Sequence, residues 1–191
     1  KNRLIQLGEN KKNIFTTGAL GVDNFFKTKK IDKNKIIRRY DLNKKYKIAL
    51  VTFHPETRSI IPIKKQIEIF LKSLKKIRNI NLLFTYNNAD TNADYFIKKI
   101  NEFAKSNHNN VSVIKSLGSN MYFSILQSAD IIIGNSSSGL LEAPSFKIAT
   151  INIGDRQEGR VQAKSVINCE INEKQIMKAI NIFFLKKFKF N

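Results

Sequence analysis

The stretch that decides the fold is Ile131-Ile132-Ile133-Gly134-Asn135-Ser136-Ser137-Ser138-Gly139, which Leu140-Leu141-Glu142-Ala143-Pro144 follows at once. Three β-branched apolar residues in a row are typical of a short strand buried on both faces, as in a parallel sheet. The two glycines bracket a serine cluster where the next helix should begin. Serine hydroxyls cap helix N-termini, and the free N–H groups there favour an anion. The stretch therefore predicts a strand, an anion-binding turn and a helix.

A second apolar run, residues 148–153, ends in the loop Gly154-Asp155-Arg156-Gln157-Glu158-Gly159-Arg160. This loop offers two guanidinium groups, Arg156 between its two glycines and Arg160 directly after the second, again at the carboxyl end of a predicted strand. Crevices at those ends are where doubly wound sheets bind nucleotides. A serine–glycine turn taken alone is usually only a capped loop. Two such segments after consecutive strands favour a ligand that carries phosphate.

The chain from residue 47 onward alternates between strand-like and helix-like segments. In the first predicted helix, apolar side chains at positions 63, 67, 70, 74 and 77 trace one face. Strands that alternate with helices predict a parallel sheet with right-handed crossovers. The expected fold class is thus α/β, a Rossmann-like doubly wound parallel sheet. We expect strands over residues 48–53, 82–86, 111–114, 131–133, 148–151 and 166–168, and helices over residues 60–77, 91–106, 121–127, 138–146 and 172–185.

The first forty residues show a less regular pattern. Residues 14–17 are strand-like, and residues 32–40 form a weak helical pattern after Gly18 and Gly21. We therefore expect a hinge or domain junction here. The phenylalanines Phe15, Phe25, Phe26, Phe70 and Phe103 are interpreted as core residues rather than as ligand platforms.

The two strand-end loops resemble the signature half of the hydrolysing UDP-N-acetylglucosamine 2-epimerases, of the type found in sialic and legionaminic acid pathways. The order and spacing agree from residue 3 to about residue 169, and the long signature is specific. One departure is Asn87, where the family more often has proline. The matching segments are Gly134-Asn135-Ser136-Ser137-Ser138-Gly139, Glu142-Ala143-Pro144-Ser145-Phe146, Ile153-Gly154-Asp155-Arg156-Gln157-Glu158-Gly159-Arg160, Gly18-Ala19-Leu20-Gly21-Val22-Asp23, Phe53-His54-Pro55-Glu56-Thr57 and Asn88-Ala89-Asp90-Thr91-Asn92.

The resemblance implies an architecture of two Rossmann-like domains, as in B-type glycosyltransferases, with the substrate in the cleft between them. On this basis residues 1–40 are expected to be the end of the N-terminal domain and the interdomain junction. Residues 41–191 are expected to be the C-terminal, UDP-binding domain. The first residue is Lys1 rather than methionine, so we interpret the chain as a piece of a longer protein.

The resemblance also implies an activity. Family enzymes convert UDP-N-acetylglucosamine, or a related acetamido sugar nucleotide, to UDP and the free 2-epimerised sugar. They do so by anti elimination of UDP to a glycal, followed by addition of water. The general acid–base carboxylates of such enzymes lie mostly in the N-terminal domain, and none of them is matched in this chain. The chain alone is therefore expected to bind a UDP-sugar and not to turn it over.

His54 is the candidate catalytic residue. It follows an apolar strand directly and precedes Pro55, a place where a side chain can face a cleft. Taken alone, such a histidine is more often a capping or packed residue. The resemblance implies a functional histidine here, and an imidazole can donate a proton or hydrogen bond near a departing diphosphate.

Candidate UDP-binding residues follow from the two loops and the resemblance. Ser136 and Ser137 could bind the β-phosphate or cap the helix, and both roles are compatible. The resemblance has Glu142 hold the ribose hydroxyls, whereas the simpler interpretation is a carboxylate that complements the helix dipole. Arg156 offers a planar fork for phosphate oxygens. Arg160 could do the same, or pair with an acidic neighbour on its loop.

Asn88 and Asp90 follow the second predicted strand. They could contact uracil, or they could only shape their loop. No cofactor is expected. No metal site is expected either, because the two histidines come with no ligand-like cluster.

Composition limits the remaining function classes. The 191 residues are 42% hydrophobic with one cysteine, Cys169, which fits a globular domain, allows no internal disulfide and suits a cytoplasmic location. No apolar run approaches a membrane span. The net charge of +19 is spread as lysine pairs without a nucleic-acid-binding motif, which indicates a solvated basic exterior. We therefore expect no nucleic-acid or membrane partner, and the oligomeric state, including a homo-oligomer, stays open.

Two other function classes stay open at this point. A UDP-sugar-dependent glycosyltransferase would share the nucleotide subsite, although its donor motif usually lacks the Gly154-Asp155-Arg156-Gln157 loop. A non-catalytic basic binding module is the other class, and it would bind RNA rather than UDP.

Overall fold

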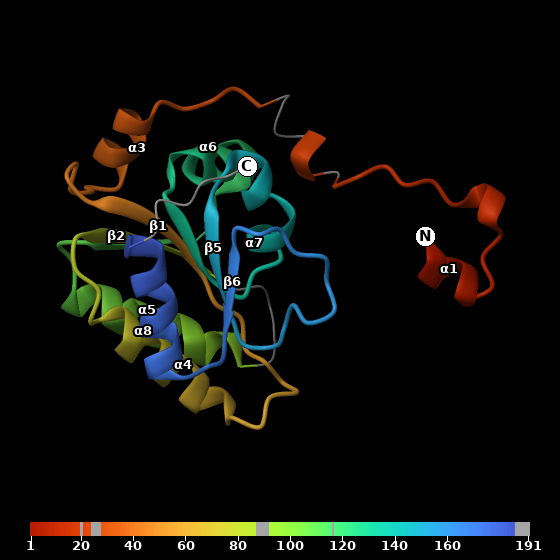
Figure 1. Ribbon diagram of the computed structural model, residues 1–191. Coiled ribbons are helices and arrows are strands. Elements are labelled where there is room, and N and C mark those ends of the chain that lie inside the picture. Colours follow the sequence, from red (N-terminus) through yellow and green to blue (C-terminus); the bar gives the residue numbers. More distant parts are fainter. Residues whose placement is uncertain (20, 24–27, 87–91, 116, 186–191) are drawn as a thin grey trace.

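The computed structural model describes residues 1–19, 21–23, 28–86, 92–115 and 117–185, and its centre is one parallel sheet (Figure 1). The strand order is β3-β2-β1-β4-β5-β6, and every neighbouring pair is parallel. This confirms the expected α/β fold class and its doubly wound topology. The strands are β1 Lys47–Thr52, β2 Ile80–Thr85, β3 Val111–Ile114, β4 Ile131–Gly134, β5 Ala149–Ile153 and β6 Val166–Cys169.

Two hydrophobic layers cover the two faces of the sheet. Alternating residues of β1 face opposite layers, since Ala49 and Val51 belong to one buried cluster and Ile48 and Leu50 to the other. The first layer consists of α4 Ile63–Leu74, α5 Ala93–Ser106 and α8 Glu173–Leu185; the second contains α3 Lys33–Arg39, α6 Gly118–Ser128, α7 Ser138–Leu141 and the 3₁₀ helix η2 Ala143–Phe146.

Phe53 anchors the segment that leads into the candidate site. Its ring is 1% exposed and stacks on Phe70 of α4 at 4.4 Å between ring centroids. A second stacking contact joins it to Phe96 of α5 at 5.9 Å. Such aromatic pairs add about 0.5–1.5 kcal/mol beyond the area they bury. The residue immediately before His54 is therefore fixed in the core.

Helix boundaries differ from the sequence-based expectation where proline intervenes. The helix expected over residues 60–77 spans only Ile63–Leu74, with Pro62 at its N-cap. Proline disfavours helical geometry at the residue before it, so the helix begins after it. The helix expected over residues 138–146 breaks into α7 and η2, with Pro144 in the first turn of η2. Pro144 has no N–H for a helical bond to Leu140 and cannot continue α7.

The N-terminal segment differs most from expectation. Residues 14–17 form no strand, because they pair with none of the sheet's strands. Phe15, expected in the core, is 78% exposed, on an N-terminal arm that lies outside the sheet (Figure 1). This arm contains α1 Asn2–Gln6, which buries no residue, and the 3₁₀ helix η1 Lys11–Asn13. Phe25 and Phe26 lie outside the described residues.

Helix α3 packs with the sheet rather than with the arm. Ile36 and Ile37 are buried in the second hydrophobic layer, and the helix contacts α6. The expected division between residues 40 and 41 stays a prediction about a longer protein. Across the described residues, no helix is both long and apolar enough to cross a bilayer.

Candidate functional site

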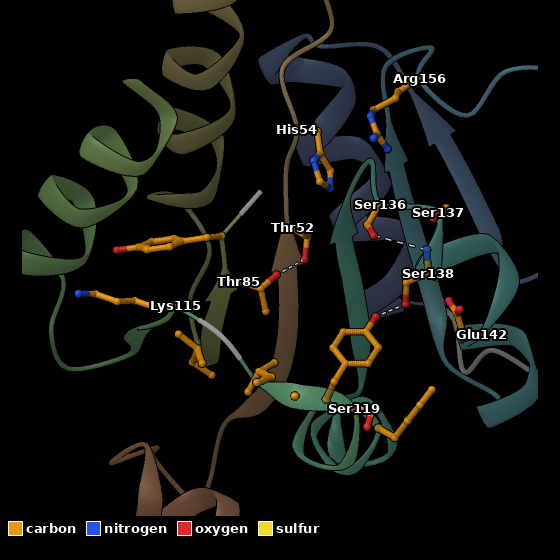
Figure 2. A pocket seen from close by; sticks show the side chains of 16 residues that line it. Thr52, His54, Thr85, Lys115, Ser119, Ser136, Ser137, Ser138, Glu142 and Arg156 are labelled. Atoms are coloured by element: carbon orange, nitrogen blue, oxygen red, sulfur yellow. Dashed lines mark hydrogen bonds between the residues drawn. The ribbon is translucent and has the colours of Figure 1, made fainter. Parts of the chain in front are cut away.

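A cavity of about 570 Å³ lies at the carboxyl ends of β1, β2, β3 and β4 (Figure 2). β1 and β4 are neighbours in the sheet, although three helices and two strands separate them in the chain. The connection after β1 leads to α4 on one face, and the connection after β4 leads to α7 on the other. This reversal of direction is the switch point at which open α/β sheets bind ligands.

The β4 loop, residues 134–138, begins with a glycine that no other residue could replace without strain. Gly134 has φ +139°, and a Cβ atom there would lie 1.9 Å from the backbone oxygen of Thr52. The next residue, Asn135, donates its N–H to that same oxygen at 3.1 Å. The loop therefore lies tightly against the end of β1.

Asn135 connects the β4 loop to His54. Its side chain is fully buried, accepts a hydrogen bond from the His54 N–H at 2.7 Å and donates one to the His54 carbonyl at 2.9 Å. This two-way pairing replaces strand hydrogen bonds beyond the end of β1. It holds the backbone of His54, whose side chain is 5% exposed and lines the cavity.

The serines after Asn135 line the cavity, but they do not cap α7 as expected. Ser137 occupies the N-cap position without a side-chain capping bond, and Ser136 Oγ accepts only a 3.4 Å hydrogen bond from the Ser138 N–H. α7 has four residues, too short for a strong dipole. The hydroxyls of Ser136 and Ser137 are thus presented to the cavity by the turn itself (Figure 2).

Ser138 pairs with Tyr122 of α6. The two hydroxyl groups are hydrogen-bonded to each other, and both side chains line the cavity. The pKa of Tyr122 is raised to about 12, chiefly by burial and also by the nearby Glu142 carboxylate, against the opposing effect of the hydrogen bond to Ser138. Tyr122 is therefore neutral at physiological pH. Its hydrogen bond to Ser138 connects α6 to the β4 loop.

The position of Glu142 does not agree with the simpler interpretation, in which its carboxylate complements a helix dipole. It follows α7 and precedes η2, so it cannot complement the N-terminal dipole of α7. Its side chain lines the cavity, and its Oε2 atom is buried without a hydrogen-bond partner among the described residues. Gly21 lies against it, since a Cβ atom there would come within 2.7 Å of Glu142 Oε1. An unpaired carboxylate oxygen is suited to accept hydroxyl donors of a ligand.

The β5 loop, residues 154–160, contributes one guanidinium group to the cavity. Arg156 lines it and donates from Nη1 to the Asn135 carbonyl at 3.2 Å. Gln157, almost fully buried, donates to the same carbonyl at 2.7 Å. The β4 and β5 loops are thus joined through one backbone oxygen.

The structure brings most of the predicted site residues together. His54, Ser136, Ser137, Glu142 and Arg156 line one cavity. Arg160 is exposed on the β5 loop and is not among the residues that line it, so its contact with UDP stays a prediction. Asn88 and Asp90 lie outside the described residues.

Several lining residues were not identified from the sequence. They include Lys115, Ser119 and Tyr122 around the start of α6, and the hydrogen-bonded hydroxyls of Thr52 and Thr85 (Figure 2). The threonines carry a usable signal, because each is the last residue of a strand and the carboxyl ends of parallel strands share one edge. The cationic groups of Arg156 and Lys115 and the carboxylate of Glu142 together suit a ligand that carries both phosphate and hydroxyl groups.

Comparison with known proteins agrees with this geometry. The family model described as UDP-N-acetylglucosamine 2-epimerase matches residues 1–190. The chain is 35% identical over 191 residues to the GDP/UDP-N,N'-diacetylbacillosamine 2-epimerase (hydrolyzing) of Campylobacter jejuni, with 100% of this chain and 49% of that protein covered. It is 38% identical over 190 residues to polysialic acid biosynthesis protein P7 of Escherichia coli, with 98% and 48% covered.

A solved structure supports the fold. The S. aureus MnaA–UDP complex superposes with a TM-score of 0.71 at 18% sequence identity, over 97% of this chain and 50% of that one. The chain spans about half the length of the curated relatives it matches. Because the family model covers almost every residue, the protein belongs to the UDP-N-acetylglucosamine 2-epimerase family.

Proposed function

We propose that this chain is the nucleotide-binding part of a hydrolysing 2-epimerase that acts on UDP-N-acetylglucosamine or a related UDP-acetamido sugar. The observation that carries the proposal is that His54, Ser136, Ser137, Glu142 and Arg156 line one cavity at the switch point of the sheet. The names of the curated relatives support the substrate class, since one acts on a nucleotide-linked diacetamido sugar. Residues 1–40 would then lead in from the N-terminal domain.

The diphosphate would lie between the β4 and β5 loops. Ser136 and Ser137 offer hydroxyl donors, and Arg156 offers a cationic fork whose Nη1 is already oriented by the Asn135 carbonyl. A charge-assisted contact of this kind is shorter and stronger than a neutral one. The ribose hydroxyls would donate to Glu142, whose buried Oε2 has no partner among the described residues. The base would lie beyond the ribose, toward Ser119 and Tyr122, which line the same cavity; the carboxylate of Glu142 lies near Tyr122.

His54 would act at the bond between sugar and diphosphate. During elimination the C1–O bond breaks, its electron pair goes to the departing UDP, and a base removes the C2 proton. A donor at His54 would stabilise the negative charge that accumulates on the diphosphate, more strongly in the transition state than in the bound substrate. Water then adds across the glycal with C2 protonated on the opposite face. The carboxylates that move the C2 proton would come from the N-terminal half.

Binding by the 191-residue chain tests the proposal. We expect isothermal titration to detect weak UDP binding, and a coupled assay to detect no UDP release from UDP-N-acetylglucosamine above a heat-treated control. Release of UDP by the chain alone would contradict the assignment of the carboxylates to the missing half. If titration detects binding of a short RNA but not of UDP, the chain is a basic binding module and the proposal is wrong.

The product distinguishes the epimerase from a glycosyltransferase. With the N-terminal half present, we expect a free 2-epimerised sugar without any acceptor. Turnover that requires an acceptor hydroxyl would instead indicate a glycosyltransferase. We also expect the full-length protein to work in the cytoplasm.

A further inference from the structure

Glu56 is a buried carboxylate beside the cavity that no part of the proposed reaction uses. Its side chain is 8% exposed, in the segment after His54. Its Oε2 accepts the backbone N–H of Asp155 at 3.3 Å, and its Oε1 accepts the backbone N–H of Arg156 at 3.2 Å. Asn135 donates to Oε1 from its amide at 3.2 Å. Both carboxylate oxygens are thus occupied by groups from the β4 and β5 loops.

The two N–H groups that Glu56 accepts are consecutive donors after a strand, the kind of nest that binds an anion in many phosphate sites. Here an anion of the protein itself fills the nest. Gly154 shows how close this contact is: it has φ +80°, and a Cβ atom there would lie 2.3 Å from Glu56 Oε1. The backbone N–H groups of Asp155 and Arg156 are therefore directed to Glu56, and of the residues of the β5 loop only Arg156 lines the cavity.

Glu56 is itself held by helix α4. Its backbone N–H donates to Gln66 Oε1 at 2.9 Å, and Gln66 Nε2 donates to the Glu56 carbonyl at 2.9 Å. Gln66 is fully buried and also donates to the carbonyl of Ile61 at 2.8 Å. A continuous set of hydrogen bonds thus runs from the helix through Glu56 to the loop that carries Arg156.

We propose that Glu56 is a positioning residue of the UDP-sugar site: its carboxylate fills the N–H nest of the β5 loop and so orients Arg156 toward the diphosphate. This role presupposes the proposed function, because it acts through the contact between Arg156 and phosphate. It also predicts that the nest binds no second phosphate, since Glu56 already neutralises its donors.

A double-mutant cycle on the 191-residue chain tests this role through UDP affinity. Arg156→Ala should weaken UDP binding by about 10- to 150-fold, as expected for a lost charge-assisted contact. Glu56→Gln keeps the shape but turns amide hydrogens toward the loop N–H groups, and should weaken binding by about five- to ten-fold. In the Arg156→Ala background, Glu56→Gln should change UDP affinity by less than about two-fold, because the guanidinium group that Glu56 positions is absent. Glu158→Gln, which removes an exposed carboxylate from the same loop, is the matched control and should change affinity by less than about two-fold.

The outcomes separate this role from the proposed function. If Arg156→Ala leaves UDP affinity unchanged, the proposed phosphate contact fails. If Arg156→Ala weakens binding but Glu56→Gln has no effect, or has the same effect in both backgrounds, only the positioning role fails. Melting temperatures are measured for all variants. If Glu56→Gln does not fold, Gly154→Ala replaces it in the cycle, since its Cβ atom would displace the loop from Glu56, and additive effects would again overturn the role.

Discussion

The β4 loop and the β5 loop are similar in sequence but present different groups to the cavity. Each follows a buried strand, begins with a glycine at positive φ and carries polar residues. The β4 loop presents the hydroxyls of Ser136 and Ser137 to the cavity. The β5 loop gives the backbone N–H groups of Asp155 and Arg156 to Glu56, and of its side chains only that of Arg156 lines the cavity.

The difference teaches that a glycine-rich strand end does not by itself define a phosphate-binding backbone. Whether the N–H groups are available depends on which side chain lies opposite, and Glu56 is about 100 residues away from Arg156 in the chain. Asn135 joins the two loops, because its backbone carbonyl accepts from Arg156 and its side chain holds His54.

The largest effect is expected at His54, which lies between the two loops. In the full-length protein, His54→Ala should reduce turnover of UDP-N-acetylglucosamine by about 100- to 10,000-fold while UDP affinity changes much less. The loops bind the ground state in this scheme, whereas His54 acts on charge that develops as the C1–O bond breaks. Turnover, UDP affinity and thermal melting are compared for the two proteins. Near-normal turnover per folded molecule would return His54 to a packing role.

Asn135→Ala should destabilise the fold, because Asn135 joins the β4 loop to the segment after β1. The change removes the hydrogen-bond partners of the buried His54 N–H and carbonyl and one partner of Glu56. Leaving such groups unpaired should lower the free energy of unfolding by about 2–5 kcal/mol. Urea unfolding of the 191-residue chain measures it. Asn120→Ala, at an exposed position of α6, is the control and should stay within about 0.5 kcal/mol of the wild type.

A pair of substitutions compares the two loops directly. Arg156→Ala should cost about 1.5–3 kcal/mol of UDP binding, because it removes a charge-assisted phosphate contact. Ser136→Ala should cost about 1 kcal/mol, because it removes a neutral hydroxyl. UDP titration of both variants gives the ranking. A larger loss for Ser136→Ala than for Arg156→Ala would reverse the roles assigned to the β4 and β5 loops.

The smallest effect concerns Tyr122, whose hydroxyl group is hydrogen-bonded to Ser138 of the β4 loop. Tyr122→Phe removes the hydroxyl bonded to Ser138 and should cost about 0.5–1 kcal/mol at neutral pH. The pH dependence has a definite sign. Burial raises the pKa of Tyr122 to about 12, so between pH 10 and 12 the folded state keeps a proton that the unfolded state releases, and stability falls as pH rises.

Unfolding of wild type and Tyr122→Phe across this alkaline range tests the assignment. The wild type should lose more stability per pH unit than the variant does. Cys169, whose pKa burial also raises to about 12, contributes a decline of the same sign to both proteins and cancels in the difference. Identical slopes would mean that Tyr122 is solvated in the folded protein.

Much of the fold could be predicted from the sequence because the relevant signals are local. Apolar runs such as residues 131–133 and 148–153 become strands in the structure, and the helical pattern at positions 67, 70 and 74 marks a face that is buried. The helix ends near Pro62 and Pro144 were misplaced, although the residues that moved them were visible. Phe15 was wrongly placed in the core, since apolar character does not say whether a segment reaches the sheet.

The amino-acid sequence alone was enough to predict an α/β domain of the UDP-N-acetylglucosamine 2-epimerase family, with candidate ligand residues after its strands. Only the tertiary structure decided that β1 lies beside β4, which brings His54 next to Asn135 across 81 positions of the chain. The tertiary structure also shows that Glu56 accepts the N–H groups of Asp155 and Arg156 in the β5 loop. The physical reason is the sequence separation over which each signal acts. Propensity and periodicity act over a few residues, whereas a hydrogen bond across the sheet depends on strand order, which no local pattern encodes.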